Sequence, residues 1–266
     1  MNSDQSVQQR IPSRVEIKTQ RAITHIRELE KCLQDVRDHY SNEVSLDDNG
    51  ILRIAEVGKF QPHEMPSVIV GDAVHNLRCA LDYIMSDTMS MFGHNPRQFY
   101  FPISNDQYSL VQHRSFTKIR DLVPNLAQFL LDEIKPYKTV NFGYWAINEM
   151  DNADKHRLLA IVNGNTNFTI KCTESDQDPS VLEPNIFYVL PKGLKPKVGS
   201  PMAIHNIEYS KGTVDFIFGD SEPFAGKPVI PVLYDFVRLV YDTLRKFIVF
   251  MRQLDIPQGS KCPKLN

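Results

Sequence analysis

The stretch from Val68 to Met89 constrains the fold more than any other part of the chain, because its apolar residues recur at every third or fourth position. That spacing matches the turn of an α-helix, about 3.6 residues, and predicts one long amphipathic helix with Ser67 as its N-cap. Such a helix is stable only when its apolar stripe is buried, so the chain must supply partner elements. The stripe consists of Val70, Val74, Leu77, Leu81 and Ile84.

The opposite side of this helix is polar, but it lacks the residues that normally face water. Neither Lys nor Glu occurs from Met65 to Thr117, where charge is carried by Asp and Arg with added His. Short carboxylates, His and Asn suit fixed hydrogen-bond networks, and Arg suits paired hydrogen bonds to carboxylate or phosphate. The sequence therefore predicts either a functional site or a buried polar network here. The polar side holds Asp72, His75, Asn76, Arg78, Cys79, Asp82, Tyr83 and Ser86.

Other parts of the chain predict partners for this helix. Residues 15–40 and 231–254 carry apolar side chains at three- and four-residue steps, so each is expected to form a long helix that packs with the first. Shorter helices are expected at 116–122, 125–134 and 145–159.

Residues 161–230 have a different pattern, in which β-branched and aromatic runs alternate with turn residues. This pattern is typical of a small antiparallel sheet, and Tyr209–Thr213 is expected to connect a hairpin. We therefore predict an α+β fold, in which the small antiparallel β-sheet is inserted before the C-terminal helix. The predicted domains are a helical bundle of long antiparallel helices over 10–160 with a short strand near 51–60, the β portion over 161–230, and a helix at 231–256 that returns to the bundle.

Composition limits the classes of partner. A formal net charge of -2 and a pI of about 6.4 give no overall positive field that would attract nucleic acid or an anionic membrane, although a local basic groove is compatible with both values. The start of the chain is polar, and no run of about 18 apolar residues follows, so we expect a cytoplasmic protein that does not enter a membrane.

Isolated cysteines and histidines give weaker signals. The four cysteines form no C-x-x-C pair, which argues against a zinc knuckle, a redox dithiol or a disulfide framework. We interpret Cys32 and Cys79 as reduced thiols in or near the core. The histidines interpreted as structural or surface residues are His63, His94, His113 and His205.

A second polar cluster follows in the helix predicted at 145–159. Asn148, Asn152 and His156 are spaced by four residues and are expected to share one helix face. Asp151 and Lys155 have the spacing of an ordinary surface pair, and we interpret them as one. Only the first three residues are therefore candidates for a site.

The two polar clusters can form one site if their helices are neighbours. His75 and His156 would then meet over Asp72 or Asp82, giving the acid, base and cation that phosphoryl or acyl transfer needs. The alternative for His156 is a hydrogen-bonded histidine at a helix end. Asp72 and His75 have a spacing that suits a metal, but no Glu-x-x-His pair supports a di-iron bundle, so no metal or other cofactor is predicted. Serine-hydrolase, P-loop and Rossmann motifs do not occur in the sequence.

The segment from Gly71 to Tyr83 reads G-D-A-V-H-N-L-R-C-A-L-D-Y. It resembles a widespread bacterial family of uncharacterised proteins that carry G-D-x-x-H-N-L-R-S-A-L-D-H, then F-P-I, and later N-x-D-K-H-R. The counterparts here are Phe101–Ile103 and Asn152–Arg157, so the resemblance covers roughly residues 60–160.

The same segment is similar, more distantly, to the R-x4-H signature of HEPN-type helical RNases, which occur in toxin and antiphage systems. In those enzymes the Arg binds the scissile phosphate and the His transfers the 2′-hydroxyl proton without a metal. Arg78 matches the Arg, but Tyr83 stands at the His position, and a tyrosine hydroxyl is a poor general base at neutral pH. The resemblance therefore implies that His75 or His156 replaces the missing His, and that the protein forms a homodimer.

Two main functions are expected from these patterns. The first is HEPN-like, metal-independent cleavage of RNA, with catalytic residues His75, Arg78, Asp82 and His156 and binding residues Asp72, Asn76, Tyr83, Asn152 and Asp154. The alternative is a non-catalytic binding or assembly protein in which the same residues form a buried network and the β portion supplies the interaction surface. A small-molecule hydrolase is a third possibility, which a pocket beside Asp72 and Tyr83 would favour.

Overall fold

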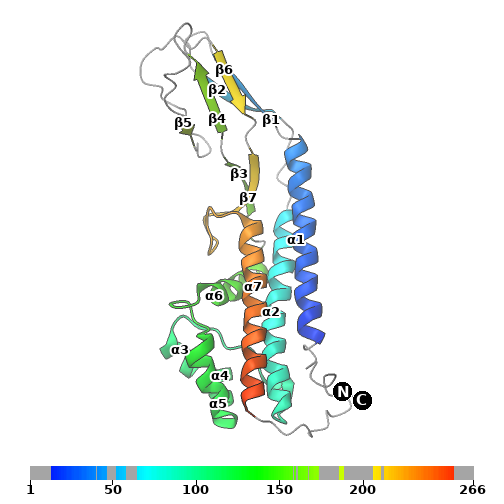
Figure 1. Cartoon of the computed structure of the whole chain (residues 1–266), viewed down its shortest axis with the longest axis vertical. Helices are drawn as coiled ribbons and strands as arrows, with labels where there is room; N and C mark the ends of the chain where they lie inside the picture. The colour runs from blue at the N-terminus through cyan, green and yellow to red at the C-terminus, as the bar shows by residue number, and fades with distance from the viewer. Residues whose placement is uncertain are drawn as a thin grey trace, which may run out of the picture. The chain divides into compact units, whose positions relative to one another are not determined.

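The structure is a computed structural model of the chain (Figure 1). Helices account for most of the residues that it describes, which confirms the predicted helical character. None of these helices is long and apolar enough to cross a membrane. The described residues are 13–39, 41–46, 52–57, 65–157, 159, 161–166, 168–173, 186–188, 206–210 and 213–254. Their α-helices are α1 (Ser13–His39), α2 (Met65–Met91), α3 (Gln107–Gln112), α4 (Arg114–Leu122), α5 (Pro124–Phe129), α6 (Phe142–Asp154) and α7 (Val229–Gln253), with a 3₁₀ turn at Pro96–Gln98 and a π-helical turn at Leu130–Ile134.

The chain divides into two compact units, which we describe separately. Unit 1 combines Met1–Glu28, Ser67–Leu159 and Ile230–Asn266, and unit 2 combines Leu29–Pro66 and Ala160–Val229. The first part of α1 therefore belongs to unit 1 and the rest to unit 2. This division differs from the predicted one, because the segment before α2 groups with the β portion and not with the helices.

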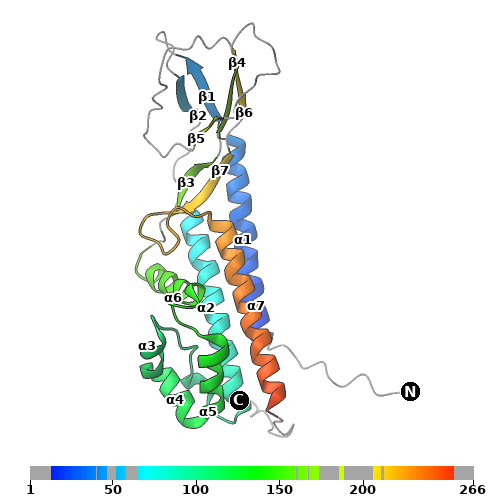
Figure 2. The same cartoon turned by 60° about the vertical axis from the view of Figure 1, so that its left-hand side comes forward.

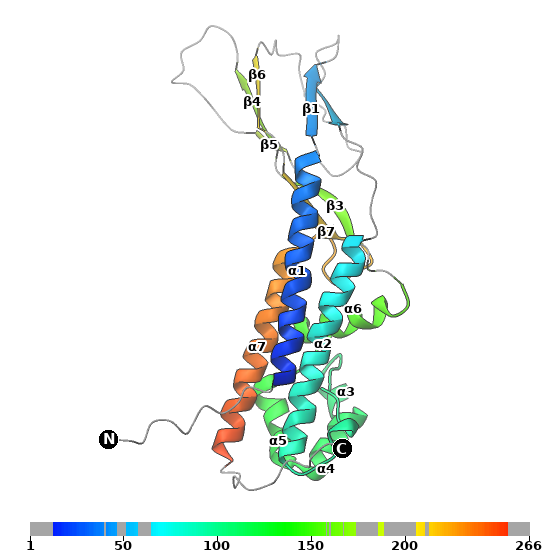
Figure 3. The same ribbon diagram turned by 90° about the vertical axis from the view of Figure 1, so that its right-hand side faces the viewer.

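Three long helical stretches form the core of unit 1. α2 and α7 run in the same direction, and residues 13–28 of α1 run in the opposite direction (Figures 1 and 3). The predicted antiparallel arrangement is therefore wrong for α2 and α7, because the long connection between them returns the chain to the end at which α2 began. The apolar stripe of α2 is buried as predicted, at Val70, Val74, Leu77, Leu81 and Ile84.

The shorter helices of unit 1 gather on one side of α2 and α7 (Figure 2). The ring of Phe247 on α7 packs against Phe101 and Phe129, with centroids 6.2 and 5.2 Å apart. A Cβ on Gly143 would lie 2.9 Å from a methyl carbon of Leu239, so a glycine at this position lets α6 approach α7 closely. These contacts fix α6 in unit 1, where it can meet α2.

Two helix boundaries differ from the prediction. α2 begins at Met65 with Pro66 in its first turn, so Ser67 lies inside the helix and is not its N-cap. α6 covers Phe142–Asp154 rather than 145–159, because the backbone N–H groups of His156 and Arg157 both bond to the carbonyl of Ala153 and close a turn. The prediction that His156 shares a helix face with Asn148 and Asn152 is therefore wrong, because His156 lies beyond the end of α6.

The described strands of unit 2 form three small antiparallel sheets rather than one. β1 (Ser41–Leu46) pairs with β2 (Leu52–Val57), β3 (Ile161–Thr166) pairs with β7 (Thr213–Phe218), and β4 (Phe168–Thr173) lies between β5 (Ile186–Tyr188) and β6 (Asn206–Ser210).

Among the described residues on either side of the hairpin connection predicted at Tyr209–Thr213, β6 pairs with β4 and β7 pairs with β3, while residues 211 and 212 lie outside the described residues. Within unit 2, Arg37 at the end of α1 donates to Asp215 of β7 at 2.5 Å. The rings of Phe216 and Phe218 are buried beside this pair on the same strand. The turn predicted at Asp47–Gly50 and the side chains of Cys172 and Cys262 lie outside the described residues.

Candidate functional site

The candidate site lies in unit 1, where the polar side of α2 meets α6 and the extended segment 99–103. It contains two groups of contacts, one around His75 and one around Arg78. Because these residues are three positions apart on α2, their side chains leave the helix on neighbouring parts of one face.

His75 is held in place by α6 through a buried carboxylate. Its Nδ1 lies 2.8 Å from Oδ1 of Asp151, and the other oxygen of Asp151 accepts a hydrogen bond from Nζ of Lys155 at 2.7 Å. The side chain of Asp151 is 6% exposed, whereas that of His75 is 50% exposed. Since a carboxylate only accepts hydrogen bonds, Nδ1 is the donor, and the lone pair of the neutral ring lies on Nε2. The His75–Asp151 dyad thus has the geometry of an acid–base histidine oriented by a carboxylate.

Cys79 extends this dyad by one more contact. Its Sγ lies 3.5 Å from Nε2 of His75, one helical turn away. Burial raises the pKa of the Cys79 thiol above its ordinary value, and the positive charge of Lys18 offsets only part of this effect. The group is therefore a protonated thiol at neutral pH, and its S–H faces the lone pair of Nε2. Any proton transfer at His75 requires this thiol to turn away.

Arg78 makes three hydrogen bonds, all to acceptors of the protein itself. It donates from Nη1 to Oδ1 of Asp82 at 2.6 Å, from Nε to Oδ1 of Asn148 at 3.2 Å, and from Nη2 to the carbonyl of Phe101 at 3.2 Å. Oδ1 of Asp82 also accepts the backbone N–H of Phe101 at 2.9 Å. Both backbone polar groups of Phe101 are thereby satisfied by one ion pair, which we call the Arg78–Asp82 clamp.

The clamp is largely shielded from solvent. The side chain of Arg78 is only 13% exposed. Burial raises the pKa of Asp82 above its ordinary value, and the charge of Arg78 and the N–H of Phe101 pull it back down. The contacts with Arg78 and Phe101 thus offset part of the cost of burying the Asp82 carboxylate. Removal of either partner of the ion pair would leave the other charged group poorly solvated.

A second support holds the neighbouring residue of the same segment. Oγ of Ser115 donates to the carbonyl of Tyr100 at 2.6 Å and accepts its N–H at 3.3 Å. Ser115 belongs to α4, so the peptide groups of Tyr100 and Phe101 are fixed from α4 and from α2 respectively. The extended segment between these helices is thus held by four hydrogen bonds from side chains.

Gly71, the first residue of the G-D-x-x-H segment, lies where α6 packs against α2. A Cβ at this position would lie 2.2 Å from Oδ1 of Asp154, so the glycine leaves room for that carboxylate at the end of α6, which a larger residue would displace. Asp154 was predicted as a binding residue, and it lies instead against the backbone of α2. The contact brings α6 close enough to α2 for the His75–Asp151 dyad to form.

The other predicted binding residues on α2 are partly covered by α1. Oδ1 of Asn76 accepts a hydrogen bond from Nζ of Lys18 at 3.1 Å, and its Nδ2 donates to the carbonyl of Asp72 at 2.7 Å. The guanidinium of Arg14 lies 4.8 Å from the centroid of the Tyr83 ring. Asp72 is exposed, so it is the residue of this group that is open to solvent.

The predicted meeting of two histidines does not occur. Among the described residues the side chain of His156 makes no hydrogen bond, and His75 bonds to Asp151 instead. Asn152 is exposed at the end of α6, where its Oδ1 lies 3.4 Å from Nζ of Lys155. Asp82, which was expected to lie between the histidines, belongs to the clamp.

The structure adds Asp151 to the residues that the sequence analysis placed in the candidate site. Asp151 was interpreted as half of a surface pair; its bond to Lys155 is present, but its carboxylate is buried. The three-residue step from Asn148 to Asp151 on α6, which matches the step from His75 to Arg78 on α2, could have indicated that Asp151 faces α2. In the described part of the chain, no group of three His, Cys, Asp or Glu side chains is placed to hold a metal ion.

Comparisons of the chain with protein-family models, with curated proteins and with solved structures found no match. The resemblance to the bacterial family and to HEPN-type proteins therefore stays a prediction, and the function has to be argued from the geometry of the site.

Proposed function

We propose that the protein is a non-catalytic binding protein in which the polar face of α2 is a structural network. One observation carries this proposal: the guanidinium of Arg78 already donates to a carboxylate, an amide and a backbone carbonyl of the protein, in a largely buried position. A phosphate would have to approach beside the carboxylate of Asp82, which repels it. The clamp therefore suits the support of segment 99–103 better than the binding of an anion.

Replacement of either clamp residue tests this proposal. Arg78→Ala should lower the free energy of unfolding by about 3 kcal/mol, because the carboxylate of Asp82 and the carbonyl of Phe101 lose their partner. Asp82→Ala should have a similar effect, and the double variant should lose less than the sum of the two. Chemical denaturation followed by circular dichroism measures all three values.

Arg120→Ala is the matched control, because Arg120 pairs with Asp121 on the exposed surface of α4. That change should cost less than about 1 kcal/mol. An Arg78→Ala protein that is as stable as the Arg120→Ala protein would contradict the structural role.

A second function is favoured by the His75–Asp151 dyad. In this proposal the protein is an HEPN-like enzyme of the cytoplasm that cleaves RNA as a homodimer, and His75 is its acid–base residue. Nε2 of His75 would take the proton of a 2′-hydroxyl while that oxygen bonds to the adjacent phosphorus and the bond to the 5′-oxygen breaks, and the departing 5′-oxygen would take a proton from water. The products would be a 2′,3′-cyclic phosphate and a 5′-hydroxyl end. The half-exposed ring and its buried carboxylate partner support this proposal.

Incubation with single-stranded RNA in EDTA tests this second function. Cleavage should disappear in His75→Gln and fall strongly in Asp151→Asn, while His94→Gln, which changes a histidine that contacts the ring of Phe99, should keep full activity. Intact RNA after incubation with the wild-type protein, across substrates of varied sequence, would exclude the enzyme and leave the binding protein.

A further inference from the structure

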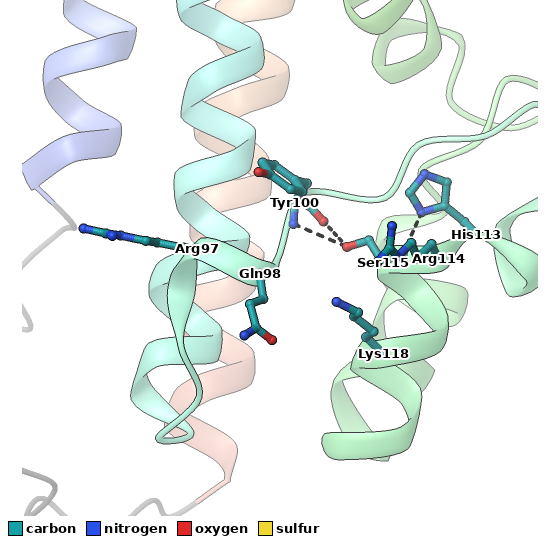
Figure 4. A pocket seen from close by; sticks show the side chains of 7 residues that line it. All are labelled: Arg97, Gln98, Tyr100, His113, Arg114, Ser115 and Lys118. Carbon is teal, nitrogen blue, oxygen red and sulfur yellow. Dashed lines mark hydrogen bonds between the residues drawn. The ribbon is translucent and has the colours of Figure 1, made fainter.

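A separate pocket of about 420 Å³ lies in unit 1 between α4 and the segment 97–100 (Figure 4). Lys118 extends from α4 toward the side of the pocket on which Gln98 lies, while Arg97 extends away from α4. We call this cavity the basic pocket. Its lining consists of Arg97, Gln98, Tyr100, His113, Arg114, Ser115 and Lys118.

The charge of the basic pocket is entirely positive. Arg97, Arg114 and Lys118 form no ion pair with any residue in the described ranges, and no carboxylate lines the cavity. Arg114 and Lys118 lie on the same helix beside the hollow without acidic partners, so their positive charges repel one another and an anion bound between them is favourable. The chain as a whole has a net charge of -2, so this concentration of positive charge is local.

The backbone of α4 adds to the same field. α4 begins at Arg114, beside the pocket, and its first turn contains no acidic residue. The positive end of the helix dipole therefore faces the region of the three cations. Nδ1 of His113 accepts the N–H of Ser115 at 3.2 Å, so the first turn of α4 is capped by a ring nitrogen and not by a negatively charged group.

Tyr100 gives the pocket a fixed aromatic wall. Its side chain is exposed, with 59% of its surface accessible, yet its peptide group is held on both sides by Ser115. Because the backbone of Tyr100 is already fixed, only the rotation of its side chain is lost when a planar group stacks on the ring. Nucleobases bind in this way on aromatic side chains beside phosphate-binding cations.

We propose that the basic pocket binds a phosphate group of a nucleotide, with the base stacked on Tyr100. The phosphate is either that of a free nucleotide or that of an RNA strand, since both present the same group. This inference rests on the proposed binding function and names its ligand. The contacts that carry it are distinct from the Arg78–Asp82 clamp, so each proposal can fail without the other.

Charge reversal on α4 tests the proposal. Binding of a fluorescein-labelled 12-nucleotide oligouridine is measured by anisotropy, with AMP and inorganic phosphate as competitors. Lys118→Glu should weaken oligouridine binding at least tenfold, and Arg114→Glu should do the same if Lys118→Glu does not fold. Arg120→Glu is the matched control, because it lies on the same helix, makes the same change in net charge and is absent from the pocket lining; it should change binding less than twofold.

The pattern of competition identifies the source of the phosphate. If AMP displaces the oligouridine from the wild-type protein but not from Lys118→Glu, both ligands bind at the basic pocket. If AMP binds and the oligouridine does not, the natural ligand is a free nucleotide. Tyr100→Ala should weaken the binding of AMP but not of inorganic phosphate. Equal weakening by Lys118→Glu and Arg120→Glu, or no binding of oligouridine and AMP by the folded wild-type protein, overturns the proposal. The free energy of unfolding of Arg78→Ala does not depend on ligand binding, so it still tests the structural network if the basic pocket binds no nucleotide.

Discussion

At the residue scale, the contact between α2 and α6 depends on the missing side chain of Gly71. A Cβ there would lie within 2.5 Å of all three atoms of the Asp154 carboxyl group. Alanine gains about 1 kcal/mol in helix propensity, but overpacking costs about 1–3 kcal/mol. We therefore expect Gly71→Ala to lower the free energy of unfolding by up to about 2 kcal/mol, measured by urea denaturation.

The double variant Gly71→Ala/Asp154→Ala provides the control, because it removes the group that the new methyl meets. Its loss of stability should be smaller than the sum of the two single losses. A Gly71→Ala protein that is about 1 kcal/mol more stable than the wild type would mean that the carboxyl group of Asp154 moves aside without cost.

The imidazole of His113 makes stability depend on pH. Burial lowers its pKa below the ordinary value, and the positive charge of Arg78 lowers it further. The unfolded chain therefore takes up this proton at a higher pH than the folded chain does. As a result, stability is complete above the ordinary pKa of about 6.5 and decreases as the pH falls through it.

His113→Asn should remove this dependence, because asparagine keeps an oxygen that can cap α4 but does not titrate. We expect the melting temperature of the wild-type protein, relative to that of the variant, to fall between about pH 7.5 and about pH 5.5. Differential scanning calorimetry at several pH values measures this difference. A difference that is constant with pH would show that His113 takes up its proton equally in the folded and unfolded chains.

The burial of some residues at the site could be predicted from the sequence, and that of others could not. The lack of Lys and Glu around α2 indicated that its polar side is covered or functional, and Asn76 and Arg78 are indeed largely covered. Asp151 was misjudged, because its spacing from Lys155 is that of a surface pair and its burial depends on how α6 packs against α2. Periodicity identifies the face of a helix, but not the element that it meets.

At the element scale, the extended segment 99–103 joins α2 to α4. Ser115 of α4 is buried and makes both hydrogen bonds to the peptide of Tyr100. Ser115→Ala would leave the N–H and the carbonyl of Tyr100 without these partners. We expect the free energy of unfolding to fall by about 1–3 kcal/mol.

Thr24→Ala is the control for this element, since the Thr24 hydroxyl bonds to the carbonyl of Gln20 on the exposed side of α1. It should change stability by less than about 0.5 kcal/mol. The same guanidinium denaturation experiment measures both proteins. A Ser115→Ala protein that behaves like the Thr24→Ala protein would show that water replaces the serine hydroxyl at Tyr100.

The long helices were predictable because each repeats its apolar spacing over many turns. The expected stretches 15–40, 68–89 and 231–254 lie within three residues of α1, α2 and α7 at either end. The short α3 was missed, since six residues carry too few repeats to be recognised, although Asp106 accepts the N–H of Ser109 as an N-cap. The direction of α7 relative to α2 was also missed, because it is set by the long connection and not by the helices.

At the scale of the whole molecule, the two units reflect interleaving of the chain. Each unit is assembled from segments far apart in sequence, so neither could be recognised from a change in composition alone. The change in pattern at about residue 160 marked the β portion, but its grouping with residues 29–66 depends on contacts between distant segments. Such contacts leave no local signal in a single sequence.

The overall charge makes a last prediction for the binding of RNA. Acidic residues outnumber basic ones, 32 to 30, so the net charge of the chain does not attract RNA, and we expect binding to rely on the basic pocket. Single strands release about 0.7 counterion for each phosphate that a protein neutralises. The two cations of α4 at the pocket, Arg114 and Lys118, should therefore give a slope of about -1.5 in a plot of log binding constant against log salt concentration. Anisotropy titrations at several salt concentrations measure this slope. A slope of about -5 or steeper would require a longer basic surface than the pocket provides, and a slope near zero would mean that phosphate contacts contribute little to binding.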